Sequence, residues 1–153
     1  TDISVGAYHV LELDTDGTKQ AEHFINAVGE DLSGRLIPAV EVRLRGLYRL
    51  LPPDYYEAAD NLADFCDRIE KQYGVRPVIY CTERTYKNIV ASDSRFNKDK
   101  IWYESLFSKP DKDMDWTFWT YTNRVKFSFY ESGEYLHMTV FNGSEDDFKK
   151  LIL

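Results

Sequence analysis

Apolar runs of strand length alternate with stretches of helical spacing along most of the chain. The apolar runs cover residues 4–11, 36–42, 78–81, 101–103 and 116–121. Residues 15–28 and the segment that follows Pro52 and Pro53 instead repeat apolar side chains every three or four positions, which predicts two helices. Short buried strands separated by helices are typical of a parallel sheet that carries helices on its faces.

Polar residues, prolines and glycines predict where these elements begin and end. The stretch 14–16 (DTD) offers N-caps for the first long helix, and Pro52-Pro53 favours the start of the second. Gly74 is placed to end that second helix. We expect a further short helix over residues 82–90.

The last third of the chain departs from strict alternation of strands and helices. Two β-rich runs, 125–131 and 135–141, flank a Ser-Gly-Glu turn at 132–134, which predicts an antiparallel hairpin. Ser144 is expected to cap a final helix that runs to residue 151. The pattern therefore predicts one α/β domain over residues 1–153, with a hairpin near its C-terminal end.

Composition narrows the classes of function. The formal net charge is −7, which argues against nucleic acid or an anionic membrane surface as the main partner. No run approaches the 18 apolar residues of a membrane span, and no signal peptide opens the chain at Thr1. Cys66 and Cys81 lie in apolar patterns and are expected to be buried free thiols rather than a disulfide framework.

The carboxyl ends of the predicted strands are the first place to look for a site, because working groups gather there in parallel α/β folds. The residues at these ends are Tyr8, His9, Glu41, Arg43, Tyr80, Trp119, Tyr121, His137 and Thr139. Trp119 and Tyr121 share a strand face and suit either a sugar-stacking platform or ordinary core. His9 suits either a site or a hydrogen-bonded core histidine.

The strand 36–42 and the residue after it carry the candidate acid chemistry. Glycoside hydrolysis needs two carboxyl groups, one protonated and one ionised, and an acid-x-acid strand places both on one face. Residues 39, 41 and 43 share such a face, but only Glu41 is a carboxylate. The guanidinium of Arg43 favours the ionised form of a neighbouring carboxyl, which opposes a role for Glu41 as a general acid.

Other chemistries find less support in the sequence. The three histidines do not fall at metal-ligand spacing, and neither CxxC nor HExxH occurs. A Ser-His-Asp set has no GxSxG nucleophile elbow to support it, and no glycine-rich phosphate loop is present. We therefore expect neither a metal nor a cofactor.

Five segments in register resemble glycoside hydrolase family 25, the muramidase type of lysozyme found in bacteria and phages. VGAYH at 5–9 with QA at 20–21, PAVEVR at 38–43, and PVIY at 77–80 are similar to three family segments. WTY at 119–121 and HMTVFNG at 137–143 are similar to the closing two. The order and spacing agree over essentially the whole chain.

The resemblance implies an irregular TIM-like β/α barrel that cleaves the bond after N-acetylmuramic acid in peptidoglycan, with a negatively charged, aromatic groove. It also implies a secreted or cell-envelope protein. By position, Tyr8, His9, Tyr80, Trp119 and Tyr121 keep the family's residue types.

The acidic positions of the family pattern are replaced. Arg43 stands at the family's catalytic glutamate, Glu41 at its neighbouring aspartate, and His137 and Thr139 at a later aspartate and asparagine. A frame shifted by two residues aligns Glu41 with the catalytic glutamate and Ala39 with the aspartate. Either way, one half of the acid pair is missing.

Two hypotheses follow, together with a weaker third. The chain is a muramidase that uses Glu41, or it is an inactive descendant that binds glycan or serves as a structural module. The third is a glycosidase that recruits Glu104, although we expect Glu104 on a solvated loop. The family's first two strands have no counterpart here, so the barrel is expected to be incomplete, with a homodimer covering its open edge.

Overall fold

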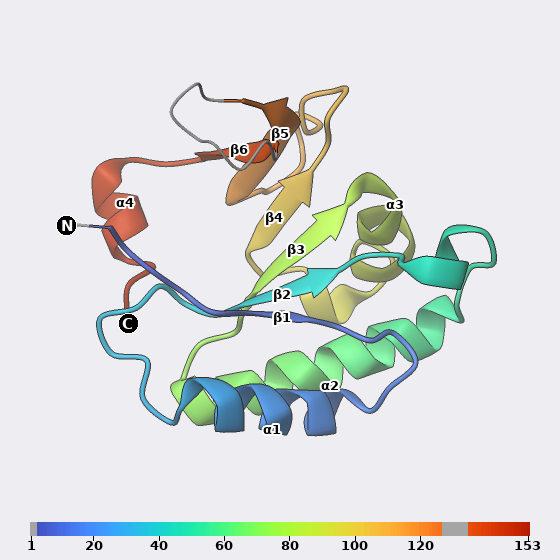
Figure 1. Cartoon of the computed structure of the whole chain (residues 1–153), viewed down its shortest axis with the longest axis horizontal. Coiled ribbons are helices and arrows are strands. Elements are labelled where there is room, and N and C mark those ends of the chain that lie inside the picture. Colours follow the sequence, from blue (N-terminus) through green and yellow to red (C-terminus); the bar gives the residue numbers. More distant parts are fainter. Residues whose placement is uncertain (1–2, 127–134) are drawn as a thin grey trace.

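A computed structural model describes residues 3–126 and 135–153 and contains one six-stranded sheet. The strands are β1 (Tyr8–Val10), β2 (Ala39–Val42), β3 (Val78–Thr82), β4 (Ile101–Glu104), β5 (Phe118–Val125) and β6 (Leu136–Phe141). They lie side by side in sequence order, and the first five are parallel (Figure 1). An antiparallel pair near the C-terminal end is confirmed, but the partner of β6 is β5 and not the expected run 125–131.

The helical elements vary widely in length. The two long ones are α1 (Gly17–Val28) and α2 (Tyr55–Tyr73), and α4 (Glu145–Lys149) is short. The remaining turns are η1 (Gly46–Arg49), α3 (Glu83–Thr85), η2 (Tyr86–Val90) and η3 (Ser94–Phe96). The helix expected over residues 82–90 is thus divided into one α-turn and a π-helical turn.

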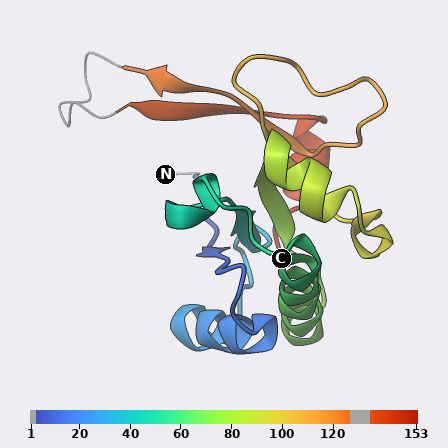
Figure 2. The ribbon, with the colours of Figure 1, turned by 90° about the vertical axis from the view of Figure 1, so that its right-hand side faces the viewer.

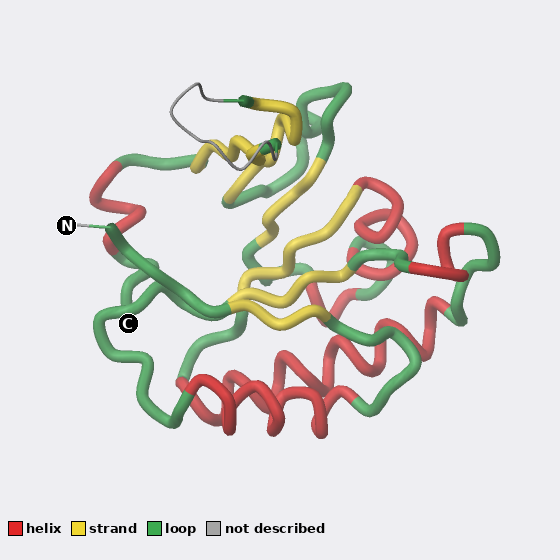
Figure 3. Tube along the Cα trace, viewed as in Figure 1, coloured by secondary structure: helices red, strands yellow, loops and turns green. Residues whose placement is uncertain are grey.

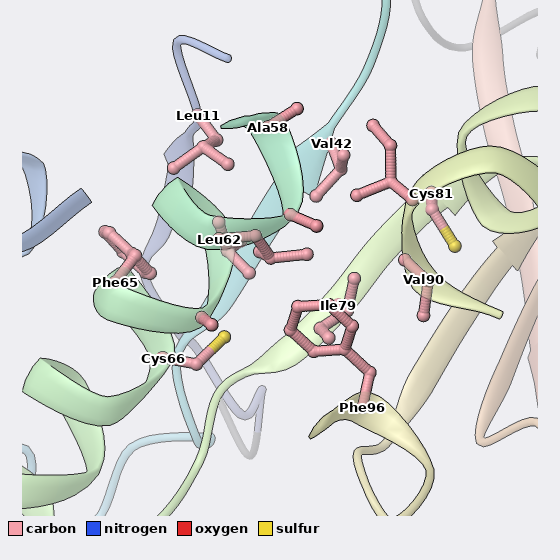
Figure 4. Packing of buried hydrophobic residues seen from close by; sticks show 14 of the residues in the cluster. Leu11, Val42, Ala58, Leu62, Phe65, Cys66, Ile79, Cys81, Val90 and Phe96 are labelled. Carbon is pink, nitrogen blue, oxygen red and sulfur yellow. The ribbon is translucent and has the colours of Figure 1, made fainter. Parts of the chain in front are cut away.

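One face of the sheet is covered by α1 and α2, which lie against each other along it (Figure 1). Leu62 and Cys66 of α2 point toward Ile79 of β3, whereas Phe65 points away from it (Figure 4) and stacks on His9 of β1; Leu62, Phe65, Cys66 and Ile79 are all fully buried. Cys66 and Cys81 are buried free thiols, as the sequence predicted. This face holds the main hydrophobic core.

The helix α1 approaches α2 closely at Gly17. A Cβ atom added at Gly17 would lie 1.8 Å from the backbone oxygen of Asn61, so any side chain there forces the helices apart. The Asn61 side chain in turn donates to the backbone oxygen of Leu13, 3.0 Å away. The contact thus fixes the loop before α1 to the middle of α2.

The ends of the long helices follow side-chain capping. Asp16, within the predicted stretch 14–16, caps α1 by accepting from the Lys19 amide. Asp54 caps α2 two residues after the start that Pro52-Pro53 suggested, because its carboxylate binds the amides of Tyr56 and Glu57. Gly74 ends α2 in the left-handed conformation, as predicted.

The opposite face of the sheet has no covering helix layer in the described parts of the chain. A small cluster of Ile37, Val78 and Leu151 lies there, with aromatic side chains from β4, β5, β6 and α4 packed against it. Within residues 3–126 and 135–153, the edge strands β1 and β6 do not pair with each other, so the sheet does not close (Figure 2). The fold is therefore an incomplete TIM-like β/α barrel, as expected.

Several strand boundaries differ from those predicted. Residues 4–7 lie outside β1, although Val5 still accepts a hydrogen bond from the Leu36 amide. Residues 118–121 of one predicted run and Val125 of the next belong to one long strand, β5, which pairs with β6 through register shifts. Residues 127–131 and the expected turn at 132–134 lie outside the described residues (Figure 3).

No helix among the described residues is long and apolar enough to cross a lipid bilayer.

Candidate functional site

The uncovered face of the sheet forms a cavity of about 710 Å³. Its lining comes from both edges of the sheet and from its centre: Gly6, Ala7, Tyr8, Leu36, Ile37, Ala39, Glu41, Arg43, Arg45, Arg49, Val78, Tyr80, Trp102, Phe118, His137 and Leu151. Alternate residues of each strand point into it, as the two-residue period of a strand requires. The polar side chains gather at the carboxyl ends of β2 and β3, where the sequence placed the candidate site.

Arg43, directly after β2, is held at the centre of an ion-pair cluster. Its Nη2 donates to Glu104 Oε2 at 2.6 Å and lies 2.9 Å from Tyr80 Oη. Its Nε lies 2.8 Å from Glu41 Oε1, within ion-pair distance but without the alignment of a hydrogen bond. The guanidinium therefore lies between two carboxylates.

The carboxylates of this cluster are buried. Glu41 is only 7% exposed and Glu104 only 8%. Glu41 also accepts from Arg45 Nη2 at 3.0 Å, and Glu104 accepts from the hydroxyl of Tyr80. Each carboxylate thus has two partners, at least one of which is a guanidinium.

The pKa shifts in the cluster reflect this balance of burial and charge. Burial lowers the pKa of Arg43, but the neighbouring carboxylates of Glu104 and Glu41 outweigh it and raise the pKa above its ordinary value. Burial and the hydrogen bond to Glu104 raise the pKa of Tyr80. Arg43 is therefore a permanent cation, and Tyr80 is a neutral hydrogen-bond donor.

The expectation that Glu104 lies on a solvated loop is wrong. It is the last residue of β4, and the parallel pairing of β3 with β4 sets it beside Thr82. The two-residue period then directs Glu104 to the same face as Trp102, toward Arg43. Sequence reasoning missed this contact because the partners are 61 positions apart, although Ile101-Trp102-Tyr103 marked the strand.

Hydrogen-bonded side chains extend the site across β4, β5 and β6. Trp102 Nε1 donates to Thr120 Oγ1 at 2.8 Å, and that oxygen lies 2.7 Å from Thr139 Oγ1. His137, two residues before Thr139 on β6, lines the cavity. The predicted residues Thr139 and His137 therefore lie on the cavity side, whereas Trp102 and Thr120 were not among the predicted site residues.

His9 lies on the opposite, helix-covered side of the sheet. Its ring stacks on Phe65 with centroids 5.0 Å apart, and its Nε2 lies 3.0 Å from Gln20 Oε1. Gln20 also binds the backbone of Glu12 and Thr15. Of the two alternatives weighed for His9, the geometry is that of a hydrogen-bonded core histidine, which ties β1 to α1.

Trp119 and Tyr121 also do not line the cavity. Their rings are 5.7 Å apart, and Trp119 packs against the main core while its Nε1 donates to the Ser105 oxygen. Tyr121 is partly exposed beside it. The predicted pair thus forms a separate aromatic surface, and the aromatic rings of the cavity belong to Tyr8, Tyr80, Trp102 and Phe118.

The charge of the cavity differs from the negative groove that the family resemblance implied. Its lining contains three arginines, Arg43, Arg45 and Arg49, against one carboxylate, Glu41. In the part of the chain that the structure describes, no group of three or more His, Cys, Asp or Glu residues could hold a metal ion. The arrangement suits a ligand that is bound by arginine donors and aromatic rings.

Comparison with known proteins gives this architecture a family context. The family model for glycosyl hydrolases family 25 matches residues 1–128. A family 25 glycosyl hydrolase from Bacillus anthracis is 30% identical with a TM-score of 0.85, covering 100% of this chain and 70% of that one.

More distant structures share the fold. A bacterial lysozyme from Streptomyces coelicolor is 23% identical over 95% of this chain and 70% of that chain, with a TM-score of 0.76. A muramidase from Acremonium alcalophilum is 23% identical over 95% of this chain and 71% of its own, with a TM-score of 0.71. No curated protein matches this chain.

Proposed function

Because the chain belongs to glycosyl hydrolases family 25, we propose that its cavity binds the glycan of peptidoglycan without cleaving it. The observation that carries this proposal is the position of Arg43 between Glu41 and Glu104. In one of the two possible alignment frames, this guanidinium stands where the family pattern places the catalytic glutamate; in the other, Ala39 replaces the paired aspartate. The rest of the cavity retains the hydrogen-bonding and aromatic groups that a sugar requires.

The chemistry of hydrolysis explains why this arrangement favours binding. A glycosidase needs one carboxyl group that carries a proton to the leaving oxygen and a second that is ionised. Here the two carboxylates lie on either side of Arg43, and each already accepts a charge-assisted hydrogen bond from a guanidinium, Glu104 from Arg43 and Glu41 from Arg45.

The aromatic lining supports the binding part of the proposal. Trp102 and Phe118 both line the cavity, and their ring centroids are 5.2 Å apart. The ring centroids of Tyr80 and Trp102 are 5.0 Å apart. Flat rings beside hydroxyl and guanidinium donors match the apolar faces and polar edges of a pyranose. These residues come from three adjacent strands, so the surface is held by the sheet itself.

Sedimentation with purified, insoluble peptidoglycan tests binding, and turbidity of the same suspension tests cleavage. We expect the chain to sediment with the wall material and the turbidity to remain constant. Trp102→Ala should weaken sedimentation, whereas Trp116→Ala, on a tryptophan that does not line the cavity, should not. Failure of the native chain to sediment would overturn the proposal.

A second candidate, a muramidase or related glycosidase, is favoured by the two buried carboxylates that meet at Arg43. In that case Glu41 and Glu104 would share the acid and base roles. Clearance of the suspension that is abolished by Glu41→Gln or Glu104→Gln would establish this function in place of the first. Retention of clearance in both variants would exclude those two residues as its catalysts.

We further propose that a second copy of the chain covers the open face, giving a homodimer. The edges of β1 and β6, which have no partner strand among the described residues, and an apolar cavity floor of Ile37, Val78 and Leu151 support it, because such surfaces are usually covered. Sedimentation velocity should then give a dimer, and a clean monomer at every concentration would contradict it. The net charge of −7 leaves nucleic acid outside the proposed partners.

A further inference from the structure

The cavity mouth carries a positive charge that the ion-pair cluster does not neutralise. In that cluster, two carboxylates, Glu41 and Glu104, face two guanidiniums, Arg43 and Arg45, so their charges balance. Arg49 also lines the cavity and adds one more positive charge. This local excess is opposite in sign to the net charge of −7 of the chain.

The donors of Arg45 and Arg49 remain available. Arg45 uses Nη2 for Glu41, and its side chain is 55% exposed. A guanidinium has five N–H donors, so most of those on Arg45 are left for a ligand. Within residues 3–126 and 135–153, no hydrogen bond or ion pair engages the guanidinium of Arg49, which is exposed.

Both arginines are positioned by the segment directly after β2. Arg45 precedes η1 and Arg49 ends it, so one turn of 3-10 helix places both side chains at the same cavity. Arg43, in contrast, already has Glu41, Glu104 and Tyr80 around it and offers little to a ligand. The free donors therefore lie at the mouth of the cavity and not at its centre.

We infer that Arg45 and Arg49 bind a carboxylate of the ligand, so that the site selects acidic over neutral glycans. Guanidinium groups bind carboxylates through paired, charge-assisted hydrogen bonds, which a neutral sugar cannot form. The inference rests on the proposed glycan-binding function and gives it a chemical specificity. On the muramyl sugar, the carboxylate is either that of the lactyl group or that of an attached peptide.

Matched disaccharides test this preference by isothermal titration calorimetry. Di-N-acetylchitobiose and N-acetylglucosaminyl-N-acetylmuramic acid differ in the lactyl group, and the methyl ester of the latter keeps the group without its charge. We expect the free acid to bind at least about tenfold more tightly than either neutral sugar. A fourth ligand, the disaccharide with an alanyl-glutamyl peptide, distinguishes the two carboxylates. Tighter binding of the free lactyl acid indicates the lactyl carboxylate, and tighter binding of the peptide ligand indicates a peptide carboxylate.

Charge-removing variants assign the preference to the two arginines. Arg45→Gln and Arg49→Gln should each reduce the ratio of acid affinity to chitobiose affinity. Arg68→Gln on α2, which alters the net charge equally but lies outside the cavity, should keep the preference. Circular dichroism and melting temperatures of the variants show whether each remains folded.

The outcomes separate this inference from the function on which it rests. Equal binding of acid, ester and chitobiose overturns the carboxylate site and leaves glycan binding intact. A preference that survives in both arginine variants also overturns it. Absence of binding to every disaccharide and to insoluble peptidoglycan overturns the proposed function, and the carboxylate site with it.

Discussion

The two faces of the sheet are made of the same strands but serve opposite purposes. On the covered face, Val40, Ile79 and Cys81 contact helices and exclude water completely. On the open face, their neighbours Glu41 and Tyr80 reach a cavity and a network of charges. The comparison teaches that one face supplies most of the stability, while the other is free to carry a ligand.

The covered face should lose the most stability on truncation. Phe65 is fully buried and stacks on His9, so Phe65→Ala should lower the free energy of unfolding by about 3–5 kcal/mol. Tyr8→Ala on the open face should change it by about 0.5 kcal/mol or less, because Tyr8 is largely exposed. Urea denaturation measures both, and similar losses would show that the faces do not differ in this way.

Overpacking is the second test of the covered face. Gly17→Ala should destabilise the protein by about 2–3 kcal/mol, since its Cβ has no room beside the backbone of Asn61. Asn26→Ala, at an exposed position of α1, is the control and should stay within about 0.5 kcal/mol. An unchanged unfolding midpoint for Gly17→Ala would mean that the helices are not in close contact.

On the open face, the central guanidinium is the most sensitive position. Arg43→Met should cost about 1–3 kcal/mol, because Glu41 and Glu104 lose their shared partner. This expected cost is smaller than for a fully buried ion pair because the Arg43 side chain is 25% exposed. Arg49→Met should be nearly neutral in the same denaturation experiment, and an equal cost would contradict the different roles assigned to these arginines.

Alkaline pH should lower the free energy of unfolding because the covered face of the sheet holds two buried thiols. Burial raises the pKa of both Cys66 and Cys81 above the ordinary value of 9.0, so the folded state holds protons that the unfolded state releases. Stability is therefore complete below pH 9.0 and falls above it, by about 1.4 kcal/mol per pH unit for each thiol.

Unfolding free energies at several pH values between about 8 and 10 measure this slope. The double variant Cys66→Ala, Cys81→Ala should start lower, because it leaves cavities, but should decline less steeply. A parallel decline in the two proteins would show that other groups titrate in this range.

Much of the fold could be predicted because local patterns specify it. The apolar periodicity predicted α1 and α2, the caps at Asp16 and Gly74 fixed two of their ends, and short apolar runs predicted parallel strands. Boundaries were less accurate where tertiary pairing decides them, as for β5, whose length depends on β6. The hairpin pattern predicted an antiparallel partner for β6 but placed it at residues 125–131, whereas the partner is β5 and pairs through register shifts.

The candidate site was predicted only in part. Strand-end reasoning identified Tyr8, Glu41, Arg43, Tyr80 and His137, all of which line the cavity. It placed His9, Trp119 and Tyr121 among them because sequence position does not reveal which face of a strand the site occupies. Trp102 was not predicted, and Glu104 was considered only in the weakest hypothesis and placed on a loop, because the sequence of β4 does not show which of its residues face the cavity.

The sequence by itself determined the alternation of elements, the burial of both thiols and the presence of only one carboxylate, Glu41, among residues 39, 41 and 43. These features depend on residue type and local spacing, which the chain order contains in full. Only the tertiary structure decided that Glu104 joins Glu41 around Arg43 and that three arginines face one cavity. Such contacts depend on strand register and on the face each side chain takes, because partners distant in sequence meet only when the sheet is assembled.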